Sequence, residues 1–174
     1  RSDRKSSFVG RKLTLLRQRA AGVSVIVPWR PDPAGHRAAV WDWISRRYRA
    51  LHPDWELVTG SCVGEWRKGE AVQDAISRAT GDTLIIADAD CMLPPGALQE
   101  AVELLEEAPW VVPHRMVRRL TRRATAELLE QDPAEGEPQG RLSRRAYEGF
   151  AGGGFVVVSR SDFEATGGIP LAFR

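Results

Sequence analysis

Residues 81–91 read GDTLIIADADC, and the fold class can be inferred from this segment and its neighbours. Thr83–Ala87 is a short apolar run rich in isoleucine, which is typical of a strand buried on both faces of a parallel sheet. Before it, Ala71–Ala79 carries apolar residues at helical spacing, and Gly81 stands where a C-cap residue would end that helix. A helix, a buried strand and then two aspartates indicate one unit of an α/β protein.

The same alternation continues outward in both directions. Further strands are predicted at Val23–Val27, ended by Pro28, and at Trp55–Thr59, Trp110–Val112 and Phe155–Ser159. Further helices are predicted at Ala38–Tyr48, Pro94–Glu107 and Asp162–Ala165. Strands and helices that alternate at this spacing predict an α/β fold with a mostly parallel sheet and flanking helices.

The remaining segments do not belong to the alternating strands and helices. Residues 1–22 hold seven cations and one acid and are interpreted as a basic arm, so that the domain covers 23–174. Arg115–Glu130 is basic and partly helical, Gln131–Gly140 (QDPAEGEPQG) is predicted to be a mobile loop, and Leu142–Phe150 a helix.

Composition excludes several classes of protein. A length of 174 residues fits one domain, and a net charge of +2 gives no sign of specific nucleic-acid binding. Two cysteines, Cys62 and Cys91, are too few for a disulfide scaffold and are interpreted as reduced thiols. No stretch has the roughly 18 to 20 apolar residues of a membrane span, so we expect a cytoplasmic protein, with contact to the cytoplasmic face of a membrane left open.

Asp88 and Asp90 are the sharpest candidates for chemistry. They follow a central strand directly, and in open α/β sheets ligands bind outside the carboxyl ends of the strands. In an extended chain, residues two apart project to the same side, so both carboxylates would face one site. Two oxygen ligands suit Mg²⁺ or Mn²⁺ bound to a diphosphate. The alternative is an aspartate pair that caps the following helix.

Arg67 and Lys68 precede a predicted helix at what should be the same edge. Cations and the free N–H groups of a helix start both favour a diphosphate there. The alternative is a solvated loop. Gly152, Gly153 and Gly154 offer backbone that a sugar or acceptor could approach closely, because no Cβ stands in the way. A glycine turn that only admits the next strand is the alternative.

The order of VSVIVP, KGEAVQDAISRATGDTLIIADADC and GGGFVVVSRSDFEATGG resembles nucleotide-sugar glycosyltransferases of the GT-A fold, particularly those of family 2. The resemblance covers about Val23 to Phe173. The positions that match the family pattern are Gly69, Ala71, Gln73, Ile76, Ala79, Gly81, Asp82, Arg160, Phe163, Gly167 and Gly168.

This resemblance implies an enzyme that transfers a sugar from a nucleoside-diphosphate sugar to a glycan, lipid or other hydroxyl acceptor, with Mn²⁺ or Mg²⁺. Asp88 would approach the ribose or a metal-bound water, and Asp90 would ligate the metal. The residues expected to bind the donor are Pro28, Trp29, Arg30, Arg67, Lys68, Gln73, Asp88 and Ala89. Those expected at the acceptor are Gly153, Gly154 and Phe155.

Physically, Trp29 could stack on a base and Arg30 could pair with phosphate, while the alternative for Trp29 is an aromatic that covers a helix. His114 is a candidate third metal ligand, although a lone histidine is more often structural.

The chain also departs from the family pattern. Gln73 stands in place of asparagine and Val72 in place of arginine, and the second strand ends in Thr59-Gly60-Ser61 rather than in an acidic cluster. No catalytic base can be named. The family's Gly-x-Glu-Asp segment would lie beyond Arg174, so a chain cut short at its C-terminus is expected, and Glu148 and Glu164 are the alternatives within it.

A basic cluster supports a rival hypothesis. If Arg115, Arg118, Arg119 and Arg122 lie on one helical face, that face could bind an anionic acceptor, anionic lipids or another polyanion. The rival is therefore a non-catalytic GT-A-like module that binds an anionic polymer or surface, and a solvated face is the plainer interpretation. A nucleotidyltransferase is third, but Pro28-Trp29-Arg30-Pro31 is not a glycine-rich phosphate loop.

Overall fold

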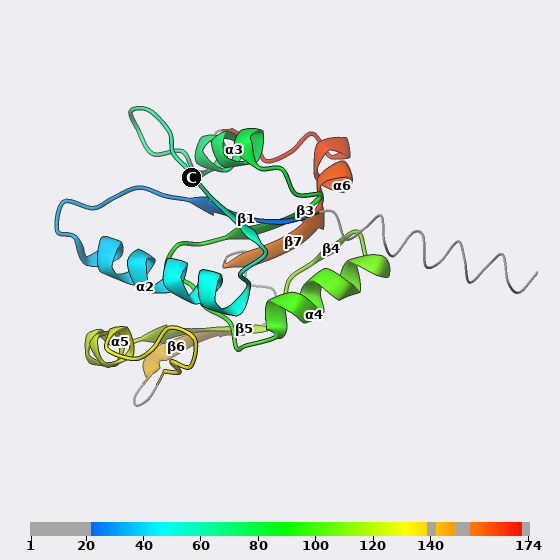
Figure 1. The fold of residues 1–174 in the computed structure, drawn as a ribbon. Coiled ribbons are helices and arrows are strands. Elements are labelled where there is room, and N and C mark those ends of the chain that lie inside the picture. Colours follow the sequence, from blue (N-terminus) through cyan, green and yellow to red (C-terminus); the bar gives the residue numbers. More distant parts are fainter. Residues whose placement is uncertain (1–21, 139–141, 149–153, 172–174) are drawn as a thin grey trace, which may run out of the picture.

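The computed structural model describes residues 22–138, 142–148 and 154–171 (Figure 1). Its main sheet has the strand order β2-β1-β3-β7-β4. In chain order these strands are β1 (Val23–Pro28), β2 (Glu56–Gly60), β3 (Thr83–Ala87), β4 (Trp110–Val111) and β7 (Phe155–Ser159). The basic arm predicted for residues 1–22 lies, except for Gly22, outside the described residues.

The sheet is parallel on one side and antiparallel on the other. β1 pairs in parallel with both β2 and β3, whereas β7 runs antiparallel to β3 and to β4. β7 therefore begins at the edge where β1, β2 and β3 end. The α/β prediction is confirmed, and the sheet as a whole is mixed.

Helices cover both faces of this sheet (Figure 1). α2 (His36–Leu51) and α4 (Ala97–Glu103), which continues into a 3₁₀ turn at Leu104–Glu106, lie on one face, and α3 (Lys68–Arg78) and α6 (Arg160–Ala165) lie on the other. Neighbouring strand residues point to opposite faces, so Val25 packs with α2 and Ile26 packs with α3. None of the described helices combines the length and apolar character that a membrane crossing requires.

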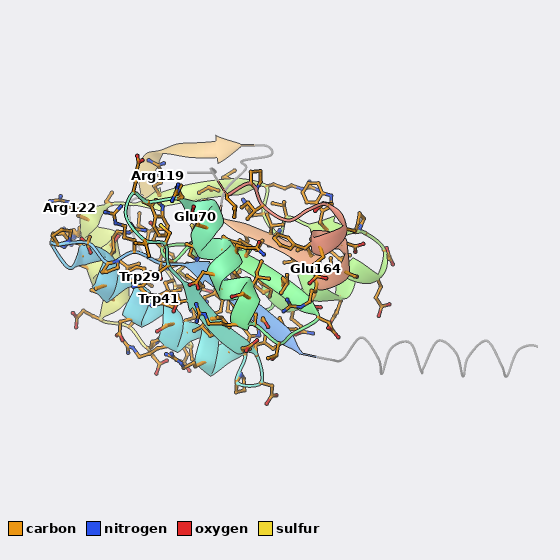
Figure 2. All side chains as sticks on the ribbon, turned by 90° about the horizontal axis from the view of Figure 1, so that it is seen from above. Trp29, Trp41, Glu70, Arg119, Arg122 and Glu164 are labelled. Carbon is orange, nitrogen blue, oxygen red and sulfur yellow. The ribbon has the colours of Figure 1, made fainter. Side chains whose placement is uncertain are left out.

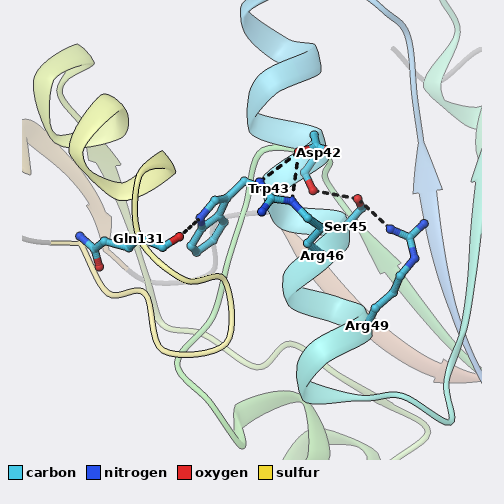
Figure 3. A network of polar contacts seen from close by, with 6 residues as sticks. All are labelled: Asp42, Trp43, Ser45, Arg46, Arg49 and Gln131. Carbon is cyan, nitrogen blue, oxygen red and sulfur yellow. Dashed lines mark hydrogen bonds and ion pairs between the residues drawn. The ribbon is translucent and has the colours of Figure 1, made fainter.

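The predicted loop 131–140 is anchored to α2 over its described part (Figure 3). The indole Nε1 of Trp43 donates to the carbonyl of Gln131 at 3.0 Å. Arg47, only 5% exposed, donates to the carbonyls of Pro133 and Gly136 at 2.8 and 3.0 Å. A side chain at Gly136 would stand 2.6 Å from the Trp43 ring, which explains the glycine.

One predicted element is wrong in type. Leu142–Glu148 forms the strand β6 rather than a helix, and it pairs antiparallel with β5 (Met116–Leu120) in a second, two-stranded sheet. Its pattern LSRRAYE gives a weak local preference, and backbone pairing with a strand about 25 residues earlier decides the outcome. The basic stretch before it is β5 followed by α5 (Arg122–Leu129), so it is partly helical as predicted.

Candidate functional site

Five elements bring their ends to one edge of the main sheet. β1, β2 and β3 end there, and β7 and α3 begin there. Trp29 N, just after β1, donates to the carbonyl of Gly60 at 2.8 Å, which joins the ends of β1 and β2. Ala87 is paired with Phe155, so the residues after β3 lie beside the start of β7. Side chains from widely separated segments therefore gather at this edge.

Asp88 lies at the centre of this edge and is held from two sides. Its Oδ1 accepts a hydrogen bond from Lys68 Nζ, the first residue of α3, and its Oδ2 accepts one from the backbone N–H of Gly154 at 3.2 Å. The Asp88 N–H in turn donates to the carbonyl of Gly154 at 2.9 Å. The side chains of Lys68 and Asp88 are 22% and 30% exposed, so the ion pair remains open to a ligand.

Asp90 is exposed, and Ala89 between the two aspartates is buried. The pair lies in a turn rather than in extended chain, and Cys91 N closes this turn on the carbonyl of Asp88 at 3.3 Å. The premise of an extended D-x-D is therefore wrong in its geometry. The capping alternative also fails, because α4 begins after Gly96 and has no side-chain cap.

Cys91 and Tyr48 lie close enough to the two aspartates to feel their charge. The Cys91 thiol is 3.9 Å from Asp90 Oδ1, and burial together with the charges of Asp90 and Asp88 raises the pKa of this thiol to about 12. Burial, followed by the charges of Cys91 and Asp88, raises the pKa of the Tyr48 hydroxyl. A thiol with a raised pKa is less reactive, and both cysteines are free thiols in the structure.

Tryptophans lie at the β1 end of the site (Figure 2). The rings of Trp29 and of Trp41 on α2 have centroids 6.0 Å apart, and the guanidinium of Arg37 lies 5.7 Å from the centre of the Trp29 ring. Arg37 is a cation that the sequence patterns missed. Trp29 is half-buried by these neighbours, and Arg30 beside it is exposed.

The other predicted donor residues lie around the start of α3. Arg67 forms an ion pair of 2.9 Å with Glu70 in the first turn of α3. Gln73 is exposed, and its Oε1 lies 3.4 Å from the point where a side chain at Gly168 would begin. Gln73 thus lies beside the turn after α6.

His114 lies next to the backbone that supports Asp88. Its ring packs edge-on against Phe155 with centroids 6.5 Å apart, and its Cε1 is 3.5 Å from the Cβ position of Gly154. Neither ring nitrogen has a hydrogen-bond partner in the structure, although both are buried. Within residues 22–138, 142–148 and 154–171, no three His, Cys, Asp or Glu side chains gather as a metal-binding group.

The predicted acceptor residues are described only in part. Gly153, like Gly152, lies outside the described residues. Gly154 has φ +97°, a conformation that L side chains rarely adopt, and Phe155 is buried at 4% exposure in the core. Backbone rather than the Phe155 ring is therefore what this segment offers to a ligand.

Of the two alternative carboxylates, Glu164 lies away from this edge. Glu164 on α6 lines a groove with Asp54 and Asp82 at the opposite edge of the sheet, far from Trp29 (Figure 2). Glu148 is the last residue of β6 and pairs with Met116.

The arginine cluster does not form the predicted helical face. Arg118 and Arg119 lie in the strand β5, and Arg122 begins α5. Neighbours in a strand point to opposite sides, so the spacing of three and four residues does not bring these arginines together. Arg115 precedes β5. The prediction failed because pairing with β6 places Met116–Leu120 in a two-stranded antiparallel sheet instead of a helix.

Residues 44–167, most of the chain, match the family model described as Glycosyl transferase family 2. The chain belongs to glycosyl transferase family 2. Its mixed sheet with flanking helices is the GT-A type of fold that the sequence resemblance implied.

Among solved structures, this family 2 chain is similar to the mannosyltransferase PcManGT from Pyrobaculum calidifontis in complex with GDP-Man and Mn²⁺. The sequence identity is 18% and the TM-score 0.47, and the similarity covers 96% of this chain and 57% of that one. The chain therefore spans little more than half the length of that protein. No curated protein sequence matches it significantly.

Proposed function

We propose that this glycosyltransferase binds a nucleoside-diphosphate sugar and a divalent cation at the carboxyl edge of its sheet, and transfers the sugar to an acceptor hydroxyl. The observation that carries the proposal is the arrangement around Asp88. A carboxylate fixed by Lys68 and by the Gly154 N–H lies two residues from the exposed Asp90, at the edge where α/β sheets bind ligands.

The donor atoms present fit Mn²⁺ or Mg²⁺. Both ions prefer oxygen ligands, and Mg²⁺ is usually held by one or two carboxylates with the other positions taken by water and substrate phosphates. Asp88 and Asp90 supply two carboxylates, and the described residues add no third cluster member. The buried, unpartnered nitrogens of His114 lie next to Gly154, which supports Asp88. When bound, the cation would neutralise charge that grows on the departing diphosphate.

The chain's own residues would then position the donor. Lys68 and the positive end of the α3 helix dipole would attract the diphosphate, because both act in the same place. Trp29 and Arg30 border the site from the end of β1, where an indole suits a base and a guanidinium suits phosphate. The backbone at Gly154 allows close approach of the sugar or the acceptor.

Calorimetry with GDP and UDP tests the donor site. Wild-type protein should bind at least one of the two nucleotides more tightly with Mn²⁺ than without it, and Asp90→Ala should remove this metal dependence. Asp90 is the better target because Asp88 also holds Lys68 and Gly154, so replacing Asp88 would disturb the fold of the site.

Asp54→Ala is the matched control, since Asp54 is an exposed carboxylate at the opposite edge of the sheet. It should bind nucleotide and Mn²⁺ as the wild type does. Equal metal-dependent binding by wild type and Asp90→Ala would overturn the assignment. Binding of a polyanion that is indifferent to metal, without nucleotide binding, would instead support the non-catalytic module.

A further inference from the structure

Lys68 and a metal ion would compete for the same oxygen of Asp88. Oδ2 of that carboxylate accepts a hydrogen bond from the Gly154 N–H, and Oδ1 accepts one from Lys68 Nζ. An ion that approaches Oδ1 meets a positively charged ammonium group in contact with it. Like charges at such a distance repel each other, so metal binding at Oδ1 is weakened for as long as the ion pair is closed.

We propose that Lys68 occupies Asp88 in the metal's place until a diphosphate draws it away, so that nucleotide and metal bind cooperatively. This inference rests on the proposed function and adds to it a mechanism that couples the two ligands. Lys68 would thus contact Asp88 without nucleotide and the diphosphate with it. Its release leaves Asp88 Oδ1 open to the cation at the moment when phosphate oxygens supply the remaining ligands.

The chemistry of lysine suits this exchange. The chain has 25 arginines and lysines, of which only Lys5, Lys12 and Lys68 are lysines. Among the residues that the structure describes, Lys68 is the only lysine. An ammonium on a flexible stem acts as a compact point charge, whereas the arginine fork holds a carboxylate bidentately. Lys68 can therefore move between two anions at low cost.

The position of Lys68 suits the exchange as well. It is the first residue of α3, an 11-residue helix whose start has no side-chain cap. The positive end of the helix dipole at that start favours a bound phosphate. A diphosphate held there would lie within reach of the Lys68 stem, because Lys68 already bridges from the helix start to Asp88.

The test compares Mn²⁺ binding with and without nucleotide, by electron paramagnetic resonance of free Mn²⁺. Without nucleotide, Lys68→Met should bind Mn²⁺ about tenfold more tightly than wild type, because one charge-assisted hydrogen bond no longer has to be broken. Without metal, the same variant should bind GDP and UDP more weakly. The factor by which nucleotide improves Mn²⁺ binding should fall about tenfold, since coupling between two ligands is reciprocal. Complexes of Mn²⁺ with free nucleotide are measured in the same buffer and subtracted.

Three further variants make the outcome decisive. Lys68→Arg keeps the charge and should keep nucleotide-free Mn²⁺ binding weak, and Lys68→Gln is a second uncharged variant should Lys68→Met fail to fold. Arg46→Met removes one exposed cation on α2, which is paired with Asp42, and should leave Mn²⁺ binding unchanged.

The inference and the proposed function fail in different ways. Unchanged or weaker nucleotide-free Mn²⁺ binding in both uncharged variants would overturn the exchange, even where Asp90→Ala abolishes binding as proposed. Absence of Mn²⁺ binding in every protein, with nucleotide present, would overturn the metal site itself and the exchange with it.

Discussion

Replacing Gly60 by alanine should push α3 away from the sheet and open the candidate site. Gly60 ends β2, and a Cβ added there would stand 1.8 Å from the carbonyl oxygen of Ala71 and 2.8 Å from the backbone nitrogen of Ala75. Both atoms belong to the backbone of α3, so no side-chain rotation can relieve the clash. Ordinary contact begins at 3.4 Å, so the helix would have to retreat by roughly 1.6 Å at that point.

The energetic cost follows from this displacement. Overpacking a well-packed core costs typically about 1 to 3 kcal/mol, and a clash with rigid backbone belongs at the upper end of that range. For a chain of this size, about 3 kcal/mol lowers the melting temperature by roughly 6 to 12 °C. Because Lys68 begins the same helix, its ion pair with Asp88 should also loosen, and nucleotide binding should weaken.

Differential scanning calorimetry and nucleotide titration measure the two effects. Gly64→Ala is the control, because a side chain at Gly64 meets nothing within 4 Å and only its φ of +77° is strained. That strain costs about 1 to 2 kcal/mol. A Gly60→Ala melting temperature within about 2 °C of wild type, or above that of Gly64→Ala, would refute the close packing of α3 on β2.

Three more substitutions test other contacts of the fold. Arg160→Met should lower the free energy of unfolding, measured in urea, by about 2 kcal/mol. Arg160 donates hydrogen bonds to the carbonyls of Ala79 and Gly81, just after α3, at 2.9 and 3.0 Å. An unchanged free energy of unfolding would show that these hydrogen bonds do not stabilise the fold. Arg47→Met should lower the free energy of unfolding by about 2 to 4 kcal/mol in the same assay, because the carbonyls of Pro133 and Gly136 would lose their buried hydrogen-bond donor. The variant should also expose the 131–138 loop to proteolysis, and undiminished protease resistance would contradict this anchoring. Partial burial acts to raise the pKa of Glu56, but hydrogen bonds from Ser24, Thr80 and Gly81 outweigh it and hold the pKa below its ordinary value of 4.5. The stabilisation by ionised Glu56 is therefore present above pH 4.5 and is lost as the pH falls through the lower pKa of the folded state. Glu56→Gln should lower the free energy of unfolding by about 1 kcal/mol at pH 7 and by almost nothing in strong acid. A destabilisation that does not depend on pH would contradict this.

The sequence predicted the elements whose own pattern is strong. VSVIV and TLIIA are buried in a sheet as their apolar, β-branched runs indicate, and α3 has the small and apolar residues of its predicted helix on its buried face. The place of Asp88 after a central strand also followed from the sequence, because strands joined by helices in a parallel arrangement end at one edge. These features depend on local periodicity and on the general rules of α/β topology.

Tertiary structure alone decided which residues meet at that edge and how. Strand β6 forms only because β5 is available to pair with it, and no pattern within LSRRAYE contains that partner. The same pairing separates the arginines that helical spacing had placed together. Lys68 and Gly154, which are 20 and 66 residues from Asp88 in the sequence, both contact it. Gly154 lies at the site because β7 runs antiparallel to β3 and begins where β3 ends. Local sequence sets the preference of each backbone segment, whereas contacts between distant segments depend on the direction and order of strands, which no single segment encodes.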